Sequence, residues 1–246
     1  DVIRDCDRCP EMAHIPAGAF LAGSPVSEKG RFLHEGPRRR IVIQRPFYIG
    51  RFEVTVEQYE AFVSESGYRP GRGCVADHNL SGFVDFRRPG FPQTGSHPVV
   101  CVSWDDAKSY ARWLSARTKL KYRLPSEAEW ELAARGGSSK AFGDSDTLDP
   151  ATLNFNTLSA GTRTVGSFPP RPNGIFDMAG NVWELVEDCW QPSLAGMPED
   201  GRPRPLAADA QCPLRTMRGG AWYNSERFVR TAARWANPAS IGGNGV

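Results

Sequence analysis

Glycine and proline interrupt this chain so often that long helices and long strands cannot dominate its fold. The 246 residues include 25 Gly and 20 Pro, about half as many again as an average globular chain carries. Gly weakens the interior of helices and strands, and Pro breaks both. The sequence therefore predicts short elements joined by many loops. Hydrophobic residues still make up 40% of the chain, which is enough for one core, because a single domain can reach roughly 250 residues.

The charge balance and the lack of a long apolar run exclude two classes of protein. Thirty Lys and Arg against 28 Asp and Glu give a net charge of +2, which argues against electrostatically driven binding to nucleic acid. The three arginines at 38–40 favour a solvated start of a strand over a phosphate site. No stretch of 18 apolar residues could span a bilayer. The first residues do not resemble a secretion signal, so the chain is either cytosolic or has lost its signal peptide.

The six cysteines favour disulfides over a metal site. Their number is even, and there is no zinc-like pair of Cys-x2-Cys motifs, which suits three disulfides in an oxidising compartment. Fifteen pairings are formally possible. Proximity along the chain favours Cys6–Cys9, Cys74–Cys101 and Cys189–Cys212. A redox role for Cys6 and Cys9 is the alternative, but such a motif belongs between a strand and a helix, whereas Pro10 and an extended apolar run follow here.

Three stretches carry the start signals of helices. Thr55 with Gln58 and Ser126 with Glu129 have the spacing of capping boxes, and Ser103 precedes two acidic residues that suit a helix N-terminus.

Strands are predicted from short apolar runs. Two such runs within residues 12–23, separated by Pro16-Ala17-Gly18, predict a hairpin. Residues 41–43 and 47–54 predict further strands. Residues 67–97 predict a long loop that a Cys74–Cys101 bridge would hold. No repeat of 20–50 residues is present, which disfavours a solenoid or a propeller.

Five motifs occur in a fixed order along the chain. They are residues 15–20 (IPAGAF), 48–55 (YIGRFEVT), 97–107 (HPVVCVSWDDA), 123–131 (RLPSEAEWE), and 180–184 (GNVWE) followed by 218–222 (RGGAW). In this order and at these distances they resemble the formylglycine-generating enzyme family, also called the sulfatase-modifying-factor domain.

The resemblance implies an α+β fold, an irregular and loop-rich variant of the C-type-lectin fold. It would form a single domain over residues 12–246, preceded by an N-terminal arm over residues 1–11 that carries Cys6 and Cys9. The family continues beyond the position of Val246 into a Gly-Phe-Arg strand.

Two metal sites known in the family lack their ligands here. The formylglycine-generating enzymes bind copper with two cysteines shortly after the Gly-Gly-Ser/Ala-Trp motif, because thiolates suit copper(I). Residues 221–230 contain no Cys. The sulfoxide synthases of the family hold iron with three His, one of them in a His-x3-His-x-Glu helix. The four His of this chain have no such spacing, so the resemblance implies neither a copper nor an iron site, and His97 favours a structural role.

Calcium is the one metal of the family whose ligands the resemblance still implies in this chain. Calcium prefers six to eight hard oxygen ligands, and the family holds one ion at the Gly-Asn-x-Trp-Glu turn and a second at an Asn-x pair. The corresponding residues are Gly180, Asn181, Val182 and Glu184 for the first ion, and Asn154 and Phe155 for the second. The second site lacks its acidic partner between residues 156 and 167. One or two structural Ca²⁺ ions are therefore implied, and the alternative makes Asn181 and Glu184 ordinary turn and cap residues.

The candidate catalytic residues come from the segment that lines the family's cleft. They are Trp222, Tyr223, Glu226 and Arg230. A Glu beside an aromatic floor and flanked by Arg suits a general base, since burial and nearby positive charge set its pKa. The alternative is that Glu226 merely pairs with Arg227 or Arg230.

Exported family members without the cysteine pair include a branch that matures pyoverdine in the periplasm of fluorescent pseudomonads. The chain is similar to this branch in its six-Cys layout. The similarity implies a periplasmic oxidoreductase, its signal peptide removed, that converts dihydropyoverdine, a peptide siderophore precursor, to the mature chromophore. Two other classes stay open: a calcium-stabilised, lectin-like binding or immunity protein with a protein partner, and a sulfatase activator that uses other residues.

Overall fold

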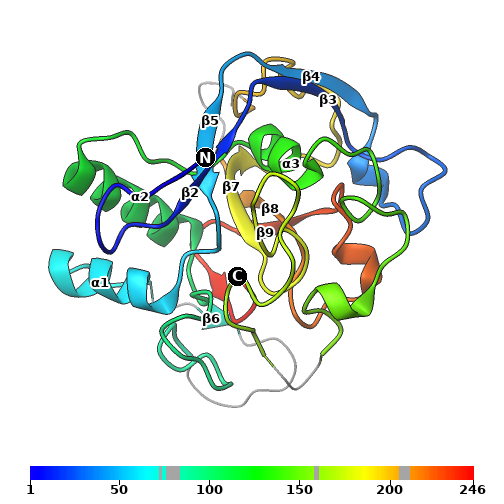
Figure 1. The fold of residues 1–246 in the computed structure, drawn as a ribbon. Coiled ribbons are helices and arrows are strands. Elements are labelled where there is room, and N and C mark those ends of the chain that lie inside the picture. The colour runs from blue at the N-terminus through cyan, green and yellow to red at the C-terminus, as the bar shows by residue number, and fades with distance from the viewer. Residues whose placement is uncertain (72–73, 76–83, 158–160, 205–210) are drawn as a thin grey trace.

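Three α-helices and ten short strands form the framework of the described part of the chain. The structure is a computed structural model, and it describes residues 1–71, 74–75, 84–157, 161–204 and 211–246. Figure 1 shows α1 and α2 on one side of the molecule, with β7, β8 and β9 in its middle and α3 above them. The architecture is α+β in a single domain with several small sheets, as the sequence predicts.

The helices begin at the predicted caps. They are α1 (Val56–Ser66), α2 (Trp104–Thr118) and α3 (Glu127–Arg135). The side chains of Thr55, Ser103 and Ser126 each accept a hydrogen bond from the backbone N–H three residues on. In return, the backbone N–H of each cap donates to the side chain three residues on, which completes a capping box. Gly67 and Gly136 end α1 and α3 in the left-handed conformation, which Gly adopts most easily. None of the described helices is long and apolar enough to cross a membrane.

The strands pair across long distances in sequence. One sheet has the order β1 (Val2–Ile3), β2 (Met12–Ile15) and β5 (Phe47–Gly50), and a second pairs β3 (Gly18–Ala22) with β4 (Arg39–Ile43). A third has the order β7 (Glu184–Cys189), β8 (Leu214–Arg218) and β9 (Arg234–Pro238). The short strands β6 (Cys74–Val75) and β10 (Gly242–Gly243) pair in parallel. Three 3-10 helices complete the framework: η1 (Leu33–Glu35), η2 (Pro150–Thr152) and η3 (Glu226–Phe228).

The predicted hairpin over residues 12–23 is wrong. Both apolar runs form strands, but β2 pairs with β5 and β1, and β3 pairs with β4. The two strands therefore belong to different sheets. The Pro16-Ala17-Gly18 break separates them without forming the two-residue turn that a hairpin requires. The strand predicted over residues 47–54 is shorter than expected and ends at Gly50.

Buried ion pairs join α3 to the strands on either side of residues 219–233. Arg218 on β8 donates to Glu127 (3.1 Å) and to Glu131 (2.8 Å), and Arg234 on β9 donates to Glu127 (2.6 Å). All four side chains are at most 2% exposed. Removing one partner of a buried pair leaves an uncompensated charge, so this network fixes both ends of the segment that carries Glu226.

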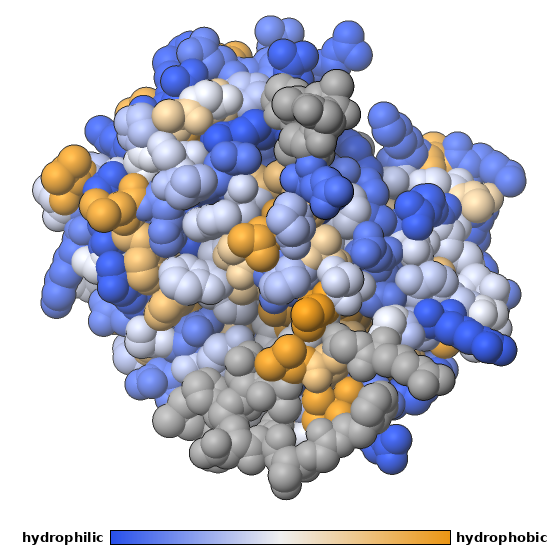
Figure 2. Space-filling model, turned by 180° about the vertical axis from the view of Figure 1, so that it is seen from behind, coloured by the Kyte–Doolittle hydropathy of each residue, from blue (hydrophilic) through white to orange (hydrophobic). Residues whose placement is uncertain are grey.

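The cysteines form the three disulfides that proximity along the chain favours. They are Cys6–Cys9, Cys74–Cys101 and Cys189–Cys212, with Cα–Cα distances of 4.9, 5.0 and 5.6 Å. No free cysteine remains. The rear face is mainly hydrophilic, with apolar side chains gathered near its lower centre (Figure 2).

Candidate active site

A tight glycine turn after β8 places Glu226. Gly219 and Gly220 both have positive φ, at 92° and 78°. A Cβ at Gly220 would lie 2.8 Å from Val229 Cγ1 and 2.9 Å from the carbonyl oxygen of Phe228, closer than real contacts allow. Only Gly therefore lets the chain pass this close to η3, which starts at Glu226.

Trp222 lies in the core beneath this turn. It is 3% exposed, its indole N–H donates to the carbonyl oxygen of Asn244 (3.2 Å), and its ring meets Phe91 edge to face at 5.3 Å. Tyr223 is partly buried and packs perpendicular to Trp222, with ring centroids 5.1 Å apart. Trp222 therefore belongs to the core under η3, whereas Tyr223 is partly exposed at the surface.

The side chain of Glu226 is exposed at the start of η3. Among the residues that the structure describes, none forms a hydrogen bond or an ion pair with its carboxylate. The expected alternative, pairing with Arg227 or Arg230, is not what the structure shows. The carboxylate of Glu226 is therefore accessible to a bound molecule.

Both neighbouring arginines bind elsewhere. Arg227 donates to the carbonyl oxygen of Gly30 (2.7 Å), and its guanidinium lies 3.7 Å from the ring centre of Phe32. Arg230 is 1% exposed and binds Glu28 and Glu35. The expectation that Arg230 flanks Glu226 in a cleft is therefore corrected: acidic residues far upstream in the sequence hold it inside the protein.

Five rings form an aromatic cluster next to η3. Its members are Phe32, His34, Trp190, Phe228 and Trp235. Phe228 lies 5.0 Å from Phe32 and 5.3 Å from Trp235, and His34 lies 4.9 Å from Trp190, between ring centroids. Trp235 is 39% exposed. The sequence analysis missed this cluster, because its rings come from four separate segments and no local pattern links them.

The aromatic cluster is uncharged at its centre and cationic at its edge. Burial lowers the pKa of His34, which keeps the imidazole neutral at pH 7, and its Nε2 lies 2.9 Å from the carbonyl oxygen of Arg234. Arg227 covers Phe32. Partly exposed aromatic rings beside an Arg suit the stacking of a planar ligand or the docking of a peptide.

The predicted calcium residues from the two motifs meet at one place. Asn154 Nδ2 donates to Asn181 Oδ1 (3.2 Å), and the backbone N–H of Arg163 donates to the same oxygen (2.8 Å). Gly180 packs so closely that a Cβ would lie 2.3 Å from the carbonyl oxygen of Asn154. The two asparagines thus join both motifs directly, whereas Val182 lies in the core and Phe155 packs in a separate apolar cluster.

Three carboxyl groups lie near these asparagines, those of Glu53, Asp177 and Glu184, and the sequence analysis predicted only one of them. Asn181 donates to Glu53 Oε1 (2.9 Å), while Glu53 Oε2 is buried without a hydrogen bond. Burial raises the pKa of Glu53, of Asp177, and of Glu184 to about 8. Only Glu184 was predicted. Glu53 stands in one family motif and Asp177 precedes another, but their proximity depends on the fold.

These residues supply hard oxygens without a preformed cage. No group of three or more His, Cys, Asp or Glu within the described ranges is arranged to hold a metal ion. Asn181 Oδ1 already accepts two hydrogen bonds. A cation would have to replace these bonds, and it would compensate the unpaired, buried oxygen of Glu53.

Comparison with known proteins places the chain in a family. The Sulfatase-modifying factor enzyme 1-like domain matches residues 1–246, and the chain belongs to this family. The solved structure of PvdO from Pseudomonas aeruginosa is similar, with a TM-score of 0.90 and 35% identity over 100% of this chain and 95% of that one. The formylglycine-generating enzyme of Streptomyces coelicolor is 31% identical over 281 residues, covering 95% of this chain and 86% of the enzyme.

The family domain also occurs inside longer proteins. The chain is 32% identical over 232 residues to the serine/threonine-protein kinase pkn1 of Chlamydia pneumoniae, which covers 92% of this chain but 35% of the kinase. The chain therefore spans about a third of the length of that relative.

Proposed function

We propose that the protein matures a peptide siderophore in the periplasm by oxidising dihydropyoverdine to the pyoverdine chromophore. The observation that carries the proposal is that η3 presents the exposed carboxylate of Glu226 two residues before Phe228, which belongs to the aromatic cluster. Family membership, the full-length similarity to PvdO and the resemblance of the six-Cys layout to the pyoverdine-maturation branch support the substrate class. Because all six cysteines are in disulfides, no thiol of this chain is available for the copper chemistry of the formylglycine-generating enzymes.

The oxidation removes two electrons and two protons from the dihydro ring. In the proposed site the chromophore stacks on the aromatic cluster, and Glu226 accepts one ring proton as a general base. Dioxygen or another two-electron acceptor takes the electrons, and the second proton passes to solvent. Tyr223 borders the site, while Trp222 and Arg230 hold its framework.

Calcium is proposed as a structural cofactor near Asn154, Asn181 and Glu184. The supporting observations are the buried Glu53, the half-buried Asp177 and Glu184, and the unpaired oxygen of Glu53. An ion there would join the two loops that the hydrogen bond between Asn154 and Asn181 already brings together. It takes no part in the proposed oxidation.

A binding role without chemistry is the second candidate. The partly exposed aromatic cluster with Arg227 at its edge also suits a protein partner, because aromatic and Arg side chains dominate binding hot spots. Recovery of one stoichiometric protein partner from a periplasmic extract, together with no turnover of a siderophore precursor, would favour this role.

The experiment that separates these candidates follows the mass of dihydropyoverdine during incubation with the purified protein in air. The proposal predicts conversion to a product lighter by two hydrogens and carrying the absorbance of the mature chromophore. A parallel incubation with a Cys-x-Pro-x-Arg peptide tests the sulfatase-activator role, and we expect no aldehyde. Unchanged dihydropyoverdine at catalytic protein concentrations would reject the oxidase.

A further inference from the structure

Asn224 closes the turn that leads from the core into η3. Its side-chain Oδ1 accepts a hydrogen bond from the backbone N–H of Ala221 (2.8 Å), and its own backbone N–H donates to the carbonyl oxygen of Ala221 (2.9 Å). Such local bonds between an Asn side chain and the backbone fix a tight turn. Because Glu226 stands two residues further along the chain, the conformation of this turn sets the direction in which η3 begins.

Two other loops hold the same turn through backbone hydrogen bonds. The N–H of Asn156 donates to the carbonyl oxygen of Asn224 (2.9 Å). The N–H of Thr157 donates to the carbonyl oxygen of Trp222 (2.9 Å), and the N–H of Trp222 donates to the carbonyl oxygen of Asn181 (2.9 Å). The residues just before η3 are therefore attached to two loops from distant parts of the sequence.

The side chain of Glu226 has no such support of its own. Ser225, the N-cap of η3, makes no side-chain cap hydrogen bond. Glu226 itself is exposed, and no described residue binds its carboxylate. Within the described part of the chain, Asn224 is therefore the last residue before η3 whose side chain fixes the backbone. The position of the Glu226 carboxylate depends on this turn rather than on a contact of its own.

The aromatic cluster is held by different contacts. The buried ion pairs of Arg230 and Arg234 fix the segments that carry Phe228 and Trp235. Neither pair involves Asn224, whose hydrogen bonds among the described residues are the ones given above. A change at Asn224 should therefore shift the start of η3, where Glu226 stands, more than it shifts the rings, which follow Glu226 or belong to other segments.

We propose that Asn224 is a positioning residue, which holds the carboxylate of Glu226 within reach of a molecule bound on the aromatic cluster. The inference rests on the oxidation proposed above, in which Glu226 accepts a ring proton. General-base catalysis requires the acceptor oxygen to lie within hydrogen-bond distance of the proton that it removes. A misplacement of about 1 Å can cost roughly 100-fold in rate, so the turn before η3 controls the rate without touching the substrate.

The test compares the parent with two variants of Asn224. Asn224→Leu keeps the size of the side chain but cannot accept the hydrogen bond from Ala221, whereas Asn224→Asp keeps an acceptor oxygen. We expect Asn224→Leu to lower kcat for dihydropyoverdine oxidation about tenfold or more and to leave KM unchanged, because other contacts hold the rings that bind the chromophore. Amide hydrogen exchange over residues 221–226, followed by mass spectrometry, should be about tenfold faster. Asn224→Asp should stay close to the parent in both measurements.

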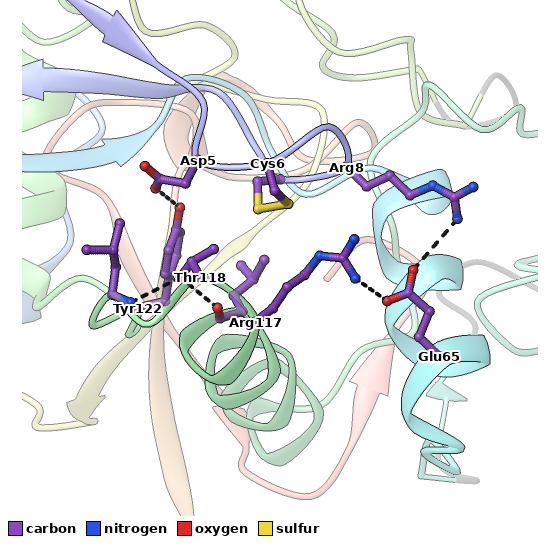
Figure 3. Close-up of a disulfide and its surroundings, with 10 residues drawn as sticks. Asp5, Cys6, Arg8, Glu65, Arg117, Thr118 and Tyr122 are labelled. Atoms are coloured by element: carbon purple, nitrogen blue, oxygen red, sulfur yellow. Dashed lines mark hydrogen bonds and ion pairs between the residues drawn. A yellow bond between two sulfur atoms is a disulfide. The ribbon is translucent and has the colours of Figure 1, made fainter.

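Two further variants control for the loss of a hydrogen bond elsewhere in the protein. Asn173→Leu is the matched substitution, because the Asn173 side chain donates to the carbonyl oxygen of Ala133 (2.8 Å). Tyr122→Phe removes the hydrogen bond to Asp5 that joins the N-terminal arm to the segment after α2 (Figure 3). Both variants should keep the parental kcat and the parental exchange rate over residues 221–226.

The outcomes separate this proposal from the proposed function. Absence of oxidation by the parent overturns both. With an active parent, only the positioning role is overturned if Asn224→Leu keeps the parental kcat, if it raises KM at unchanged kcat, or if Asn224→Asp loses as much as Asn224→Leu. Parental hydrogen exchange in Asn224→Leu also overturns it, because the turn would then not depend on this side chain. Should Asn224→Leu fail to fold, Asn224→Ala removes the same acceptor without adding bulk.

Discussion

Arg230 and Glu35 form a buried, two-pronged ion pair that assembles the candidate active site. Both terminal nitrogens of Arg230 donate to the Glu35 carboxylate, one of them at 2.9 Å, and the two side chains are 1% and 0% exposed. Arg230 follows η3, which carries Glu226 and Phe228. Glu35 ends η1, next to Phe32 and His34. The pair therefore joins two segments almost 200 residues apart, each of which contributes rings to the aromatic cluster.

Removing Glu35 should destabilise the protein strongly. Glu35→Ala leaves Arg230 with one carboxylate, and breaking a buried pair typically costs 3–5 kcal/mol. We expect a loss of about 3 kcal/mol or more in the free energy of unfolding, measured by urea denaturation. Glu60→Ala breaks the exposed pair with Arg87 (2.8 Å) and should cost about 0.5 kcal/mol. Equal effects of the two variants would show that the buried pair is not the structural link described.

The disulfides should differ in their contribution to stability. Cys74–Cys101 closes a loop with a sequence separation of 27, and Cys6–Cys9 one of 3. Loop-closure entropy predicts about 3.5 kcal/mol for the longer loop and about 2 kcal/mol for the shorter one. Replacing each pair by serines and measuring the free energy of unfolding checks the order. A larger loss for the Cys6–Cys9 pair would contradict this prediction.

The short-range patterns predicted the helices and disulfides, because a cap and its partner lie three residues apart and each bridge closes a short loop. The hairpin prediction failed because β2 selects β5, more than 30 residues away. The motif at residues 218–222 located the segment that carries Glu226 in the sequence, but not the surroundings of its side chain. The sequence did not reveal the partners of Arg230, because Glu28 and Glu35 lie about 200 residues upstream and meet it only in the folded protein. The aromatic cluster and the Glu53 and Asp177 carboxylates depend on the same long-range contacts.

Asp188 should make stability fall as pH rises through mildly acidic values. Its carboxylate accepts hydrogen bonds from the backbone N–H groups of Glu127 (2.8 Å) and Arg204 (2.9 Å), but burial and the nearby charge of Glu127 raise its pKa from 3.8 to about 6. Between these values the folded state holds a proton that the unfolded state has lost. The stability contribution is therefore present below about pH 4 and is lost as pH approaches 6 and above, with a ceiling of about 3 kcal/mol.

Asp188→Asn should remove this part of the pH dependence. Urea unfolding between pH 4 and 7 measures the difference between the parent and the variant. Asp200→Asn, at an exposed carboxylate, is the control and should follow the parent. A parental profile for Asp188→Asn would contradict the assignment.

Calcium should raise the melting temperature if the proposed ion binds. Because the pKa of Glu184 is raised to about 8 and that of Glu53 is raised as well, a cation would bind with release of protons, and millimolar Ca²⁺ at pH 7.5 should stabilise the folded state by mass action. Glu184→Gln should lose much of this response. Identical melting curves in Ca²⁺ and in chelator would reject the calcium proposal and leave the rest of the account unchanged.

The most direct measurement of the central claim compares the rate of dihydropyoverdine oxidation by the parent, Glu226→Gln and Glu199→Gln. Gln keeps the size of Glu but cannot accept the ring proton, and general-base catalysis contributes about 100-fold or more. Glu199 is also on the surface, with its side chain 77% exposed. The account predicts that Glu226→Gln loses at least about 100-fold in rate with an unchanged melting temperature, while Glu199→Gln retains the parental rate. Oxidation by Glu226→Gln at the parental rate would contradict it.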